Sequence, residues 1–408
     1  MTGTTSTTTP VGGPAARVAE LLARRTADNA EFFVTEAERI ARLCHRVAER
    51  FARGGRILAF GVTPAARSDV RHVTVEFVHP VIVGKRALPA IGLTREAGPL
   101  PLQLDLLATP EDVAIGFGAG EEAELHEGMA LARARGCLTI AFDEIGAEWA
   151  FHPPGADPFV HQELVETLYH VVWELVHVFF EHRGLLEGRK ERVVHDAGGS
   201  AFLYPFLAEA EAGLDDVLAD VRASVLMKGV EVSELREQTI RAALPTLIPL
   251  ARALRETFDA GGRLLAFGNG GSATDAMDVV ADFRDPPHRW PRRPALDLTE
   301  DTALLTALAN DIGEDSIFAR QLISHARPED LALAFSTSGN SRNIIRALRE
   351  ARRRGVRTAA LVGYDGGRIL AERLADYVVV VPSQNIPRIQ EAQASVYHIL
   401  RELVELVA

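Results

Sequence analysis

The chain is poor in cysteine and has no long apolar run. Its 408 residues include only two cysteines, Cys44 and Cys137. This number excludes a disulfide scaffold and a cysteine-rich zinc site. No apolar run reaches the roughly 18 residues that a membrane-spanning helix needs. The first residues lack the basic flank and apolar core of a signal peptide. We therefore expect a cytoplasmic protein without a membrane partner.

Positive charge is also scarce. The chain has 44 Lys and Arg residues against 56 Asp and Glu residues, so its formal net charge is −12. Nucleic acids require a basic surface, so we expect no nucleic-acid partner. The hydrophobic content of 47% and the charged content of 25% are typical of a globular protein. The length allows two domains with ordinary cores.

An internal repeat divides the chain into two halves. The segment RILAFG at 56–61 nearly repeats RLLAFG at 263–268, and each copy follows a Gly-Gly pair and a long amphipathic segment. Further on, the same 228 residues separate Gln162 from Gln390 and His170 from His398. Strands alternate with helices in each half, which predicts α/β architecture with parallel sheets and right-handed crossovers.

The repeat and the composition predict domain boundaries. Residues 1–14 are rich in Thr, Gly and Pro, and we expect them to be disordered. The first domain is expected at 15–183 and the second at 206–408, each beginning with a helical segment (15–53 and 208–260). A charged, Gly-containing linker is expected at 184–205.

A glycine-rich turn follows the strand-like run at 264–267. Asn269, Gly270, Gly271 and Ser272 lie between this run and a helical pattern. Glycines let the backbone approach a ligand closely. A helix N-terminus adds unpaired N–H groups and the positive end of its dipole, which favour an anion. By itself, such a turn is either an anion site or a plain tight turn.

A second turn of this kind favours the anion site. Ser336, Thr337, Ser338 and Ser341 surround Gly339 between the strand predicted at 331–335 and the helix predicted at 342–353. Hydroxyl groups at a helix start can act as caps. Four of them exceed what a cap needs and suit a phosphate, which accepts several hydrogen bonds. We therefore predict a phosphate or phosphosugar site at these two turns.

Five segments in order extend this prediction: GNGGSATDA, TALLTALANDIGEDSIFARQ, LAFSTSGNSRNIIRALREARRRGV, VGYDGGR and PRIQEAQASVYHILRELVE. Together they resemble the sugar isomerase (SIS) domain family, and within it the phosphoheptose isomerases, from about Glu231 to the C-terminus. The resemblance implies flavodoxin-like domains that bind a phosphorylated sugar and usually assemble as tetramers. The first half then resembles a second, degenerate SIS domain. We accordingly expect a homodimer that forms a pseudo-tetramer.

The resemblance also implies chemistry. In phosphoheptose isomerases a Glu and a His act as acid–base groups, and zinc is held by a further His, that Glu, a Gln and the acid–base His. At these positions the second half carries Asp278, Asp282, Gln390 and His398. The Asp residues depart from the pattern, and they could also be solvated acids on a helix surface. Asn310 and Asp311 belong to the implied substrate site.

The first half lacks the phosphate loops but keeps the residue types of the family zinc set. Its turn at 62–66 has no Gly-Gly pair, and its second loop carries Glu121 and Glu122, which would repel a phosphate. With one inserted residue in the turn, however, the residue types of the family zinc set fall at His72, Glu76, Gln162 and His170. Zinc would prefer this half, because it offers two imidazoles. The four residues could also be leftovers in a structural partner.

Two functions follow from these patterns. One is an aldose–ketose isomerase of the phosphoheptose type, with Glu76, His170, Asp282 and His398 as candidate catalytic residues. The other is a non-catalytic SIS protein that binds a sugar phosphate and regulates a partner. For the enzyme we expect a composite site, in which the second half anchors the phosphate and both halves act on the sugar.

Overall fold

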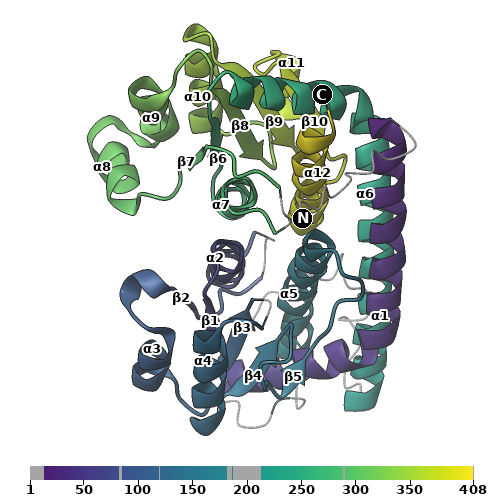
Figure 1. The fold of residues 1–408 in the computed structure, drawn as a ribbon. Coiled ribbons are helices and arrows are strands. Elements are labelled where there is room, and N and C mark those ends of the chain that lie inside the picture. The colour runs from purple at the N-terminus through teal and green to yellow at the C-terminus, as the bar shows by residue number, and fades with distance from the viewer. Residues whose placement is uncertain are drawn as a thin grey trace, which may run out of the picture.

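The computed structural model describes residues 13–81, 85–118, 120–181, 186, 213–287 and 290–407. It contains two parallel five-stranded sheets, one in each half, and each sheet is flanked by helices (Figure 1). The strand orders are β2-β1-β3-β4-β5 and β7-β6-β8-β9-β10. Both are the flavodoxin-like order, with the switch of direction beside the first strand of each sheet. The predicted fold class is confirmed.

The elements of the two halves correspond in order. The first half contains α1 (Pro14–Ala52), β1 (Ile57–Gly61), α2 (Pro64–Val78), β2 (Ala90–Leu93), η1 (Arg95–Ala97), α3 (Leu100–Leu107), β3 (Val113–Phe117), α4 (Ala123–Ala134), β4 (Leu138–Ala141), β5 (Trp149–Ala150) and α5 (Pro158–Glu181). The second half contains α6 (Leu214–Asp259), β6 (Leu264–Phe267), α7 (Gly271–Arg284), β7 (Ala295–Asp297), α8 (Thr302–Ile312), η4 (Glu314–Ser316), α9 (Ile317–His325), β8 (Leu331–Ser336), α10 (Arg342–Arg353), β9 (Arg357–Val362), α11 (Gly367–Ala371), β10 (Tyr377–Val380) and α12 (Ile386–Leu406).

The two long helices α1 and α6 pack side by side, and both run alongside the two halves (Figure 1). Val18, Leu21 and Leu22 near the start of α1 are buried in the core of the second half. Val217 and Val221 near the start of α6 are buried in the core of the first half. Each helix therefore begins against one sheet and ends at the other. The predicted boundaries, 15–183 and 206–408, remain a prediction, because each core draws on both segments.

The predicted terminal tail and linker lie almost entirely outside the described residues. Residues 1–12 are not described, and α1 already begins at Pro14. Of the predicted linker at 184–205, only Leu186 is described, and it is buried. Among the described helices, none is long and apolar enough to cross a membrane.

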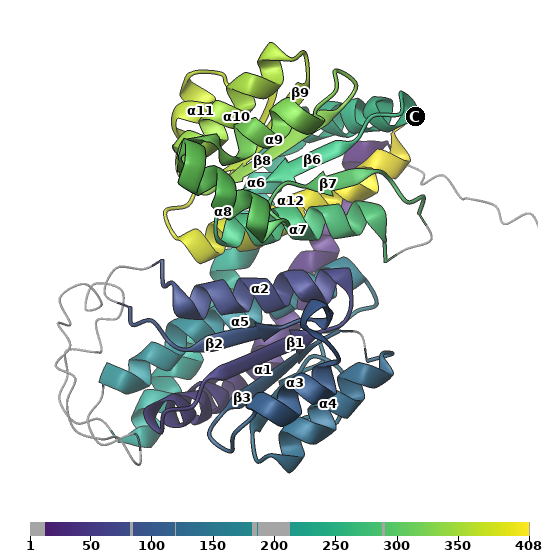
Figure 2. The ribbon, with the colours of Figure 1, turned by 90° about the vertical axis from the view of Figure 1, so that its left-hand side faces the viewer.

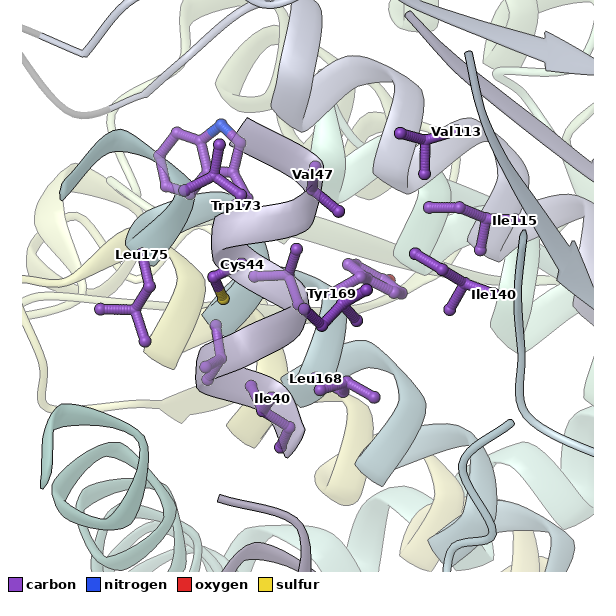
Figure 3. Close-up of a cluster of buried hydrophobic side chains, with 14 of the residues drawn as sticks. Ile40, Cys44, Val47, Val113, Ile115, Ile140, Leu168, Tyr169, Trp173 and Leu175 are labelled. Carbon is purple, nitrogen blue, oxygen red and sulfur yellow. The ribbon is translucent and has the colours of Figure 1, made fainter. Parts of the chain in front are cut away.

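The core of the first half fixes helix α5. Side chains of α1, of strands β3 and β4 and of α5 meet there (Figure 3). Trp173 and Val113 are fully buried, and Tyr169 is 4% exposed. Complete burial of a large apolar side chain contributes roughly 1.5–3 kcal/mol. This packing holds α5 in a single orientation, with His170 next to Tyr169 on a helix that is covered on all sides.

Four helices meet where the two halves come together. Helices α2 and α7 lie against each other between the two sheets, and α5 and α12 pack together beside them (Figures 1 and 2). Both α5 and α12 are buried along most of their length, including their charged and amide side chains. Buried polar groups require partners. The polar residues that the sequence analysis singled out on these helices must therefore contact one another across the interface.

Candidate functional site

Two clusters of buried polar side chains lie at this interface. The first cluster consists of His72 and Glu76 from α2, Glu166 and His170 from α5, and Gln390 and Glu391 from α12. The second cluster consists of Asp278 and Asp282 from α7, Gln162 and Glu163 from α5, and His398 from α12. They are related by the internal repeat, since α2 corresponds to α7 and α5 to α12.

The structure exchanges the two glutamines between the predicted sets. Nε2 of Gln390 donates to Nε2 of His72 at 3.1 Å, and Nε2 of Gln162 donates to Oδ1 of Asp278 at 2.8 Å. These hydrogen bonds join Gln390 to His72 and Gln162 to Asp278, while the predicted ligand sets, with Gln162 beside His72 and Gln390 beside Asp278, stay a prediction. Helices α5 and α12 each direct their glutamine toward the other half and their histidine toward a residue of their own half. Both clusters are thus composite.

In the first cluster, the two imidazoles face each other. Nε2 of His72 lies 3.3 Å from Nε2 of His170. Nδ1 of His170 donates to Oε1 of Glu391 at 3.0 Å, and Nδ1 of His72 lies 3.6 Å from Oε1 of Glu166. Metal-binding histidines commonly donate their outer ring N–H to a carboxylate, as His170 does to Glu391, whereas the distance between His72 and Glu166 is too long for a hydrogen bond. Both Nε2 atoms are therefore oriented as ligands toward a shared point.

Protonation in the first cluster also suits a cation. Burial, together with the neighbouring His170, lowers the pKa of His72 well below its usual value, so its imidazole is neutral. Burial raises the pKa of Glu76 to about 7, against the opposing effect of His170. Oε2 of Glu76, Oε1 of Glu166 and Oε1 of Gln390 are buried without a hydrogen-bond partner. Ligand atoms of His72, Glu166 and His170 all lie within 4.8 Å of one another, and the same is true of Asp278, Asp282 and His398 in the second cluster.

In the second cluster, by contrast, the histidine is paired with acidic side chains of the same cluster. Burial alone lowers the pKa of His398, but hydrogen bonds to Asp278 and Glu163 outweigh it and raise the pKa to about 10. Both ring nitrogens therefore carry protons. Nδ1 lies 2.9 Å from Oε1 of Glu163, and Nε2 lies 3.5 Å from both Asp278 and Asp282. A metal ion would have to displace the proton on Nε2 before it could bind there.

Asp278 has a full set of hydrogen-bond donors around it. Ser68 and Gln162 donate to its Oδ1, and the hydroxyl group of Tyr397 donates to its Oδ2 at 2.7 Å. Asp278 and Asp282 are each 3% exposed. The alternative in which both are solvated surface acids is therefore wrong. Helix α7 is covered by α2 and α12, so both acids point into the interface.

The glycine-rich turn of the second half borders the first cluster. A Cβ at Gly271 would lie 2.0 Å from Nε2 of Gln390 and 3.1 Å from Nε2 of His72. The preceding Gly270 has a φ of +57°, and no side chain caps the N-terminus of α7. Glycine is therefore required at 271 for close approach. The turn brings the uncapped N-terminus of α7 in one half next to a histidine of the other.

The two predicted phosphate loops are joined to each other. Asn269 and Asn343 exchange a pair of side-chain hydrogen bonds of 2.9 and 2.8 Å. Oγ of Ser336 lies 3.4 Å from Oγ of Ser341 and accepts from the backbone N–H of Gly339. No side chain caps the N-terminus of α10 at Ser341. Both helix ends can therefore present N–H groups to an anion.

The remaining predicted substrate residues differ in placement. Thr337 and Ser338 are half-buried in the second loop, and Ser272 is buried in the first turn of α7. Asn310 and Asp311 are exposed at the end of α8, where Nδ2 of Asn310 donates to Oδ1 of Asp311. The contacts found for these two residues do not connect them to either cluster. Their role in binding stays a prediction.

In the first half, the turn before α2 has a side-chain cap. Thr63 caps α2 by accepting from the backbone N–H of Ala66 at 3.1 Å, and Pro64, at the start of the helix, has no N–H. The helix end that corresponds to the glycine turn of α7 therefore offers less to an anion.

Sequence reasoning missed three carboxylates and one amide of this region. They are Glu163, Glu166, Glu391 and Asn343. The repeated Gln-Glu pair at 162–163 and 390–391 was a usable signal for two of them, because a Glu kept at both copies of a buried helix needs a partner. Glu166 has no such signal, since the corresponding residue of the second half is Ala394.

Comparison with known proteins identifies the family of the chain. Residues 230–363 match the family model of the SIS domain. Phosphoheptose isomerase from Chlorobium phaeobacteroides is 43% identical over 199 residues, which are 48% of this chain and 86% of that protein. Phosphoheptose isomerase from Roseiflexus sp. is 38% identical over 190 residues, which are 46% of this chain and 91% of that protein. The chain belongs to the SIS domain family.

Solved SIS structures extend the likeness to both halves. The C-terminal domain of glucosamine-fructose-6-phosphate aminotransferase from Francisella tularensis superimposes with a TM-score of 0.57 over 95% of this chain and 95% of its own. Tagatose-6-phosphate ketose/aldose isomerase from Escherichia coli gives 0.53 over 95% of this chain and 91% of its own. Sequence identities are 9% and 12%, so these structures support the fold alone. The first half, outside the family-model match, thus has the SIS fold as well.

Proposed function

We propose that this chain is an aldose–ketose isomerase that acts on a phosphorylated sugar, with sedoheptulose 7-phosphate as the substrate to test first. Its active site would be the first cluster together with the phosphate loops of the second half. The observation that carries the proposal is the contact of the Gly271 turn with His72 and Gln390. It joins an anion-binding turn of one half to candidate acid–base groups of the other. The similarity to phosphoheptose isomerases supports the choice of substrate.

In this proposal, the loop at 336–341 and the turn at 269–272 bind the phosphate through hydroxyl and backbone N–H groups. The sugar then extends toward α2. Glu76 acts as the base that removes a proton from the carbon next to the carbonyl and returns it to the neighbouring carbon. A pKa of about 7 suits this role, because it allows both steps near neutral pH. Its Oε2 has no competing hydrogen bond.

When Nε2 of His170 is not bound to a metal, it would move the second proton, between the two oxygens of the enediol intermediate. Its Nδ1 is fixed by Glu391, so Nε2 is the atom available to the substrate or to a metal. Arg388 forms ion pairs with Glu391 and with Glu174, and Lys228 also binds Glu174. This charged network supports His170 from the second half. It also helps to exclude water, because every one of these side chains is buried.

The first cluster fits a zinc ion better than the second. It has two imidazoles, three buried oxygen atoms without a partner, and a carboxylate that accepts a hydrogen bond from the outer nitrogen of His170. We propose His72, His170, Gln390 and Glu76 as the ligands, with Gln390 in place of the expected Gln162. Turning the Gln390 amide would bring its unpartnered Oε1 toward His72. When bound, zinc would polarise the sugar carbonyl and stabilise negative charge on the enediol oxygens.

Asp282 and His398 are assigned no catalytic role in this proposal, because His398 is already paired with Glu163, Asp278 and Asp282. Pairing of chains into a pseudo-tetramer remains part of the proposal. It is supported by apolar side chains left at the surface, with Leu106 of α3 74% exposed and Ile312 of α8 51% exposed. Light scattering should then detect a species larger than the 44.3 kDa monomer.

Incubation of the zinc-supplemented protein with sedoheptulose 7-phosphate tests the function, with aldose formation as the readout. We expect turnover that a chelator removes. Calorimetric binding of the sugar phosphate without turnover would instead support the non-catalytic, regulatory role.

A further inference from the structure

Gln393 of α12 is a buried amide without a hydrogen-bond partner. The residue is 0% exposed, and neither Oε1 nor Nε2 of its side chain forms a hydrogen bond. Among the side chains that the structure describes, Gln393 alone has two buried polar atoms and no partner for either. Burying an amide in this state is costly, and native proteins leave few such groups unpaired. A ligand that supplies both hydrogen bonds would account for it.

The internal repeat shows which part of the fold Gln393 faces. Its counterpart, 228 residues earlier in the chain, is Val165 of α5. Val165 lines a cavity of about 480 Å³ together with residues 63–66 after β1 and Gly118 after β3. This cavity therefore lies at the carboxyl edge of the first sheet, the edge where parallel α/β sheets bind their ligands. The repeat thus puts Gln393 at the same edge of the second sheet, where the phosphate loops lie.

The neighbours of Gln393 on α12 agree with this placement. Residues four apart on a helix share a face, so Gln393 lies in one row with Ile389 and Tyr397. A Cβ at Gly363 would lie 2.5 Å from Cδ1 of Ile389, and the backbone N–H of Gly363 donates to the loop between β8 and α10. Tyr397 packs against Phe335 of β8, with ring centroids 5.8 Å apart. Gln393 therefore lies next to the carboxyl end of β8, where this loop begins.

The first half links the amide to the phosphate loops. There Thr63 caps the turn before α2, Glu121 and Glu122 occupy the second loop, and the equivalent of Gln393 is an apolar valine. The second half has uncapped, hydroxyl-rich loops and the amide. The amide and the phosphate loops are thus present in the same half and missing from the same half.

The amide also differs from the phosphate loops in what it can recognise. Its Nε2 donates hydrogen bonds and its Oε1 accepts them. A phosphate dianion offers acceptors only, so it can satisfy Nε2 but not Oε1. A hydroxyl group both donates and accepts, and two neighbouring hydroxyl groups can satisfy both atoms. Such groups lie along the carbon chain of a sugar phosphate.

We propose that Gln393 binds hydroxyl groups of the sugar chain that extends from the phosphate loops. It thereby makes the site specific for phosphate esters that carry neighbouring hydroxyl groups. This inference rests on the phosphosugar site of the proposed function, but it does not require turnover.

Isothermal titration calorimetry of the full chain tests the proposal with two probes, sedoheptulose 7-phosphate and propyl phosphate, whose carbon chain has no hydroxyl group. Gln393→Met replaces the amide by an apolar side chain of similar length. This variant should bind sedoheptulose 7-phosphate about tenfold more weakly than wild type, because two neutral hydrogen bonds are lost. Its affinity for propyl phosphate should be unchanged. Val165→Met, at the equivalent position of the first half, is the matched control and should leave both affinities unchanged.

Thermal unfolding without ligand gives a second readout. An apolar side chain needs no hydrogen-bond partner, so Gln393→Met should melt no lower than wild type. The proposal is overturned if the variant binds sedoheptulose 7-phosphate as tightly as wild type, if neither protein binds it, if both probes bind the variant equally more weakly, or if the variant melts lower. Failure of the isomerase looks different, because wild type would then bind the sugar phosphate without turnover and the comparison of affinities would still apply.

Discussion

The first and second clusters occupy equivalent positions in a repeated fold, and each is built from α5, α12 and one further helix, α2 in the first cluster and α7 in the second. In the first, two imidazoles turn Nε2 toward each other, and three buried oxygen atoms have no partner. In the second, Asp278 replaces one imidazole and accepts three hydrogen bonds, while His398 is held as a cation. Where the first cluster has two facing imidazoles, His72 and His170, the second cluster therefore has an ion pair between Asp278 and His398.

The phosphate loops show the opposite asymmetry. They are intact in the second half and capped or acidic in the first. Because α5 and α12 exchange their amides, the surviving loops and the surviving ligand set meet at one place. One active site per chain is therefore the simplest outcome of this divergence. The predictions that follow each contrast a residue of the first cluster with its counterpart in the other half.

The largest expected difference concerns Glu76 and Asp282. Glu76→Gln removes the proposed base without changing the shape of the side chain, so kcat should fall about 10²–10⁴-fold. Asp282→Asn alters only the closed cluster, so kcat should stay within about tenfold of wild type. Steady-state assays with sedoheptulose 7-phosphate measure both. Equal losses in the two variants would mean that the halves do not differ in role.

The next difference concerns the turns before α7 and α2. In Gly271→Ala the new Cβ would lie 2.0 Å from Nε2 of Gln390 and would push the amide away from His72. Misplacement of about 1 Å at a reacting centre can cost about 10²-fold in rate, and we expect a loss of that order. Pro64→Ala in the first half is the matched control and should keep nearly full turnover. A fully active Gly271→Ala variant would argue against contact between the turn and the cluster during catalysis.

A third contrast uses the two glutamates behind the histidines. Glu391→Gln weakens the carboxylate that orients His170, so zinc affinity should fall about 10–100-fold. Glu163→Gln should leave zinc affinity unchanged but lower the melting temperature, because Glu163 binds both Arg25 and His398. Competition with a zinc chelator and thermal unfolding give the two readouts. The contrast fails if Glu163→Gln releases zinc as readily as Glu391→Gln.

The smallest effect concerns the stability of the second cluster against pH. The pKa of His398 is raised from 6.5 to about 10 in the folded protein. Its contribution to stability is therefore complete below about pH 6.5 and is lost as pH rises through about 10. Wild type should lose more thermal stability between pH 7 and pH 10 than His398→Gln does. Parallel curves for the two proteins would show that His398 is not held as a cation.

Sequence reasoning predicted much of the scaffold. Strand 264–267 and helix 342–353 are confirmed to the residue, and the strand predicted at 331–335 extends one residue further, to Ser336. The repeat also predicted which residue types would face the interface. Whether Asp278 is buried could not be read from α7 alone, because that depends on α2 and α12 covering the helix.

The sequence could not predict that Gln162 bonds to Asp278 and Gln390 to His72, for a similar reason. The spacing along α5 shows only that Gln162 and His170 lie two turns apart on one face. It does not show which half each residue faces. That depends on how α5 and α12 cross between the halves, a contact between segments 228 residues apart in the sequence. The partners of Glu391 and Glu166 follow from the same crossing.

The composite site is tested most directly by a crystal structure of the zinc-loaded protein with sedoheptulose 7-phosphate. The account predicts an anomalous zinc signal between His72, His170 and Gln390, with the phosphate at residues 336–341 and the sugar carbons beside Glu76. A zinc signal between Asp278, Asp282 and His398, or a sugar bound away from α2, would contradict it.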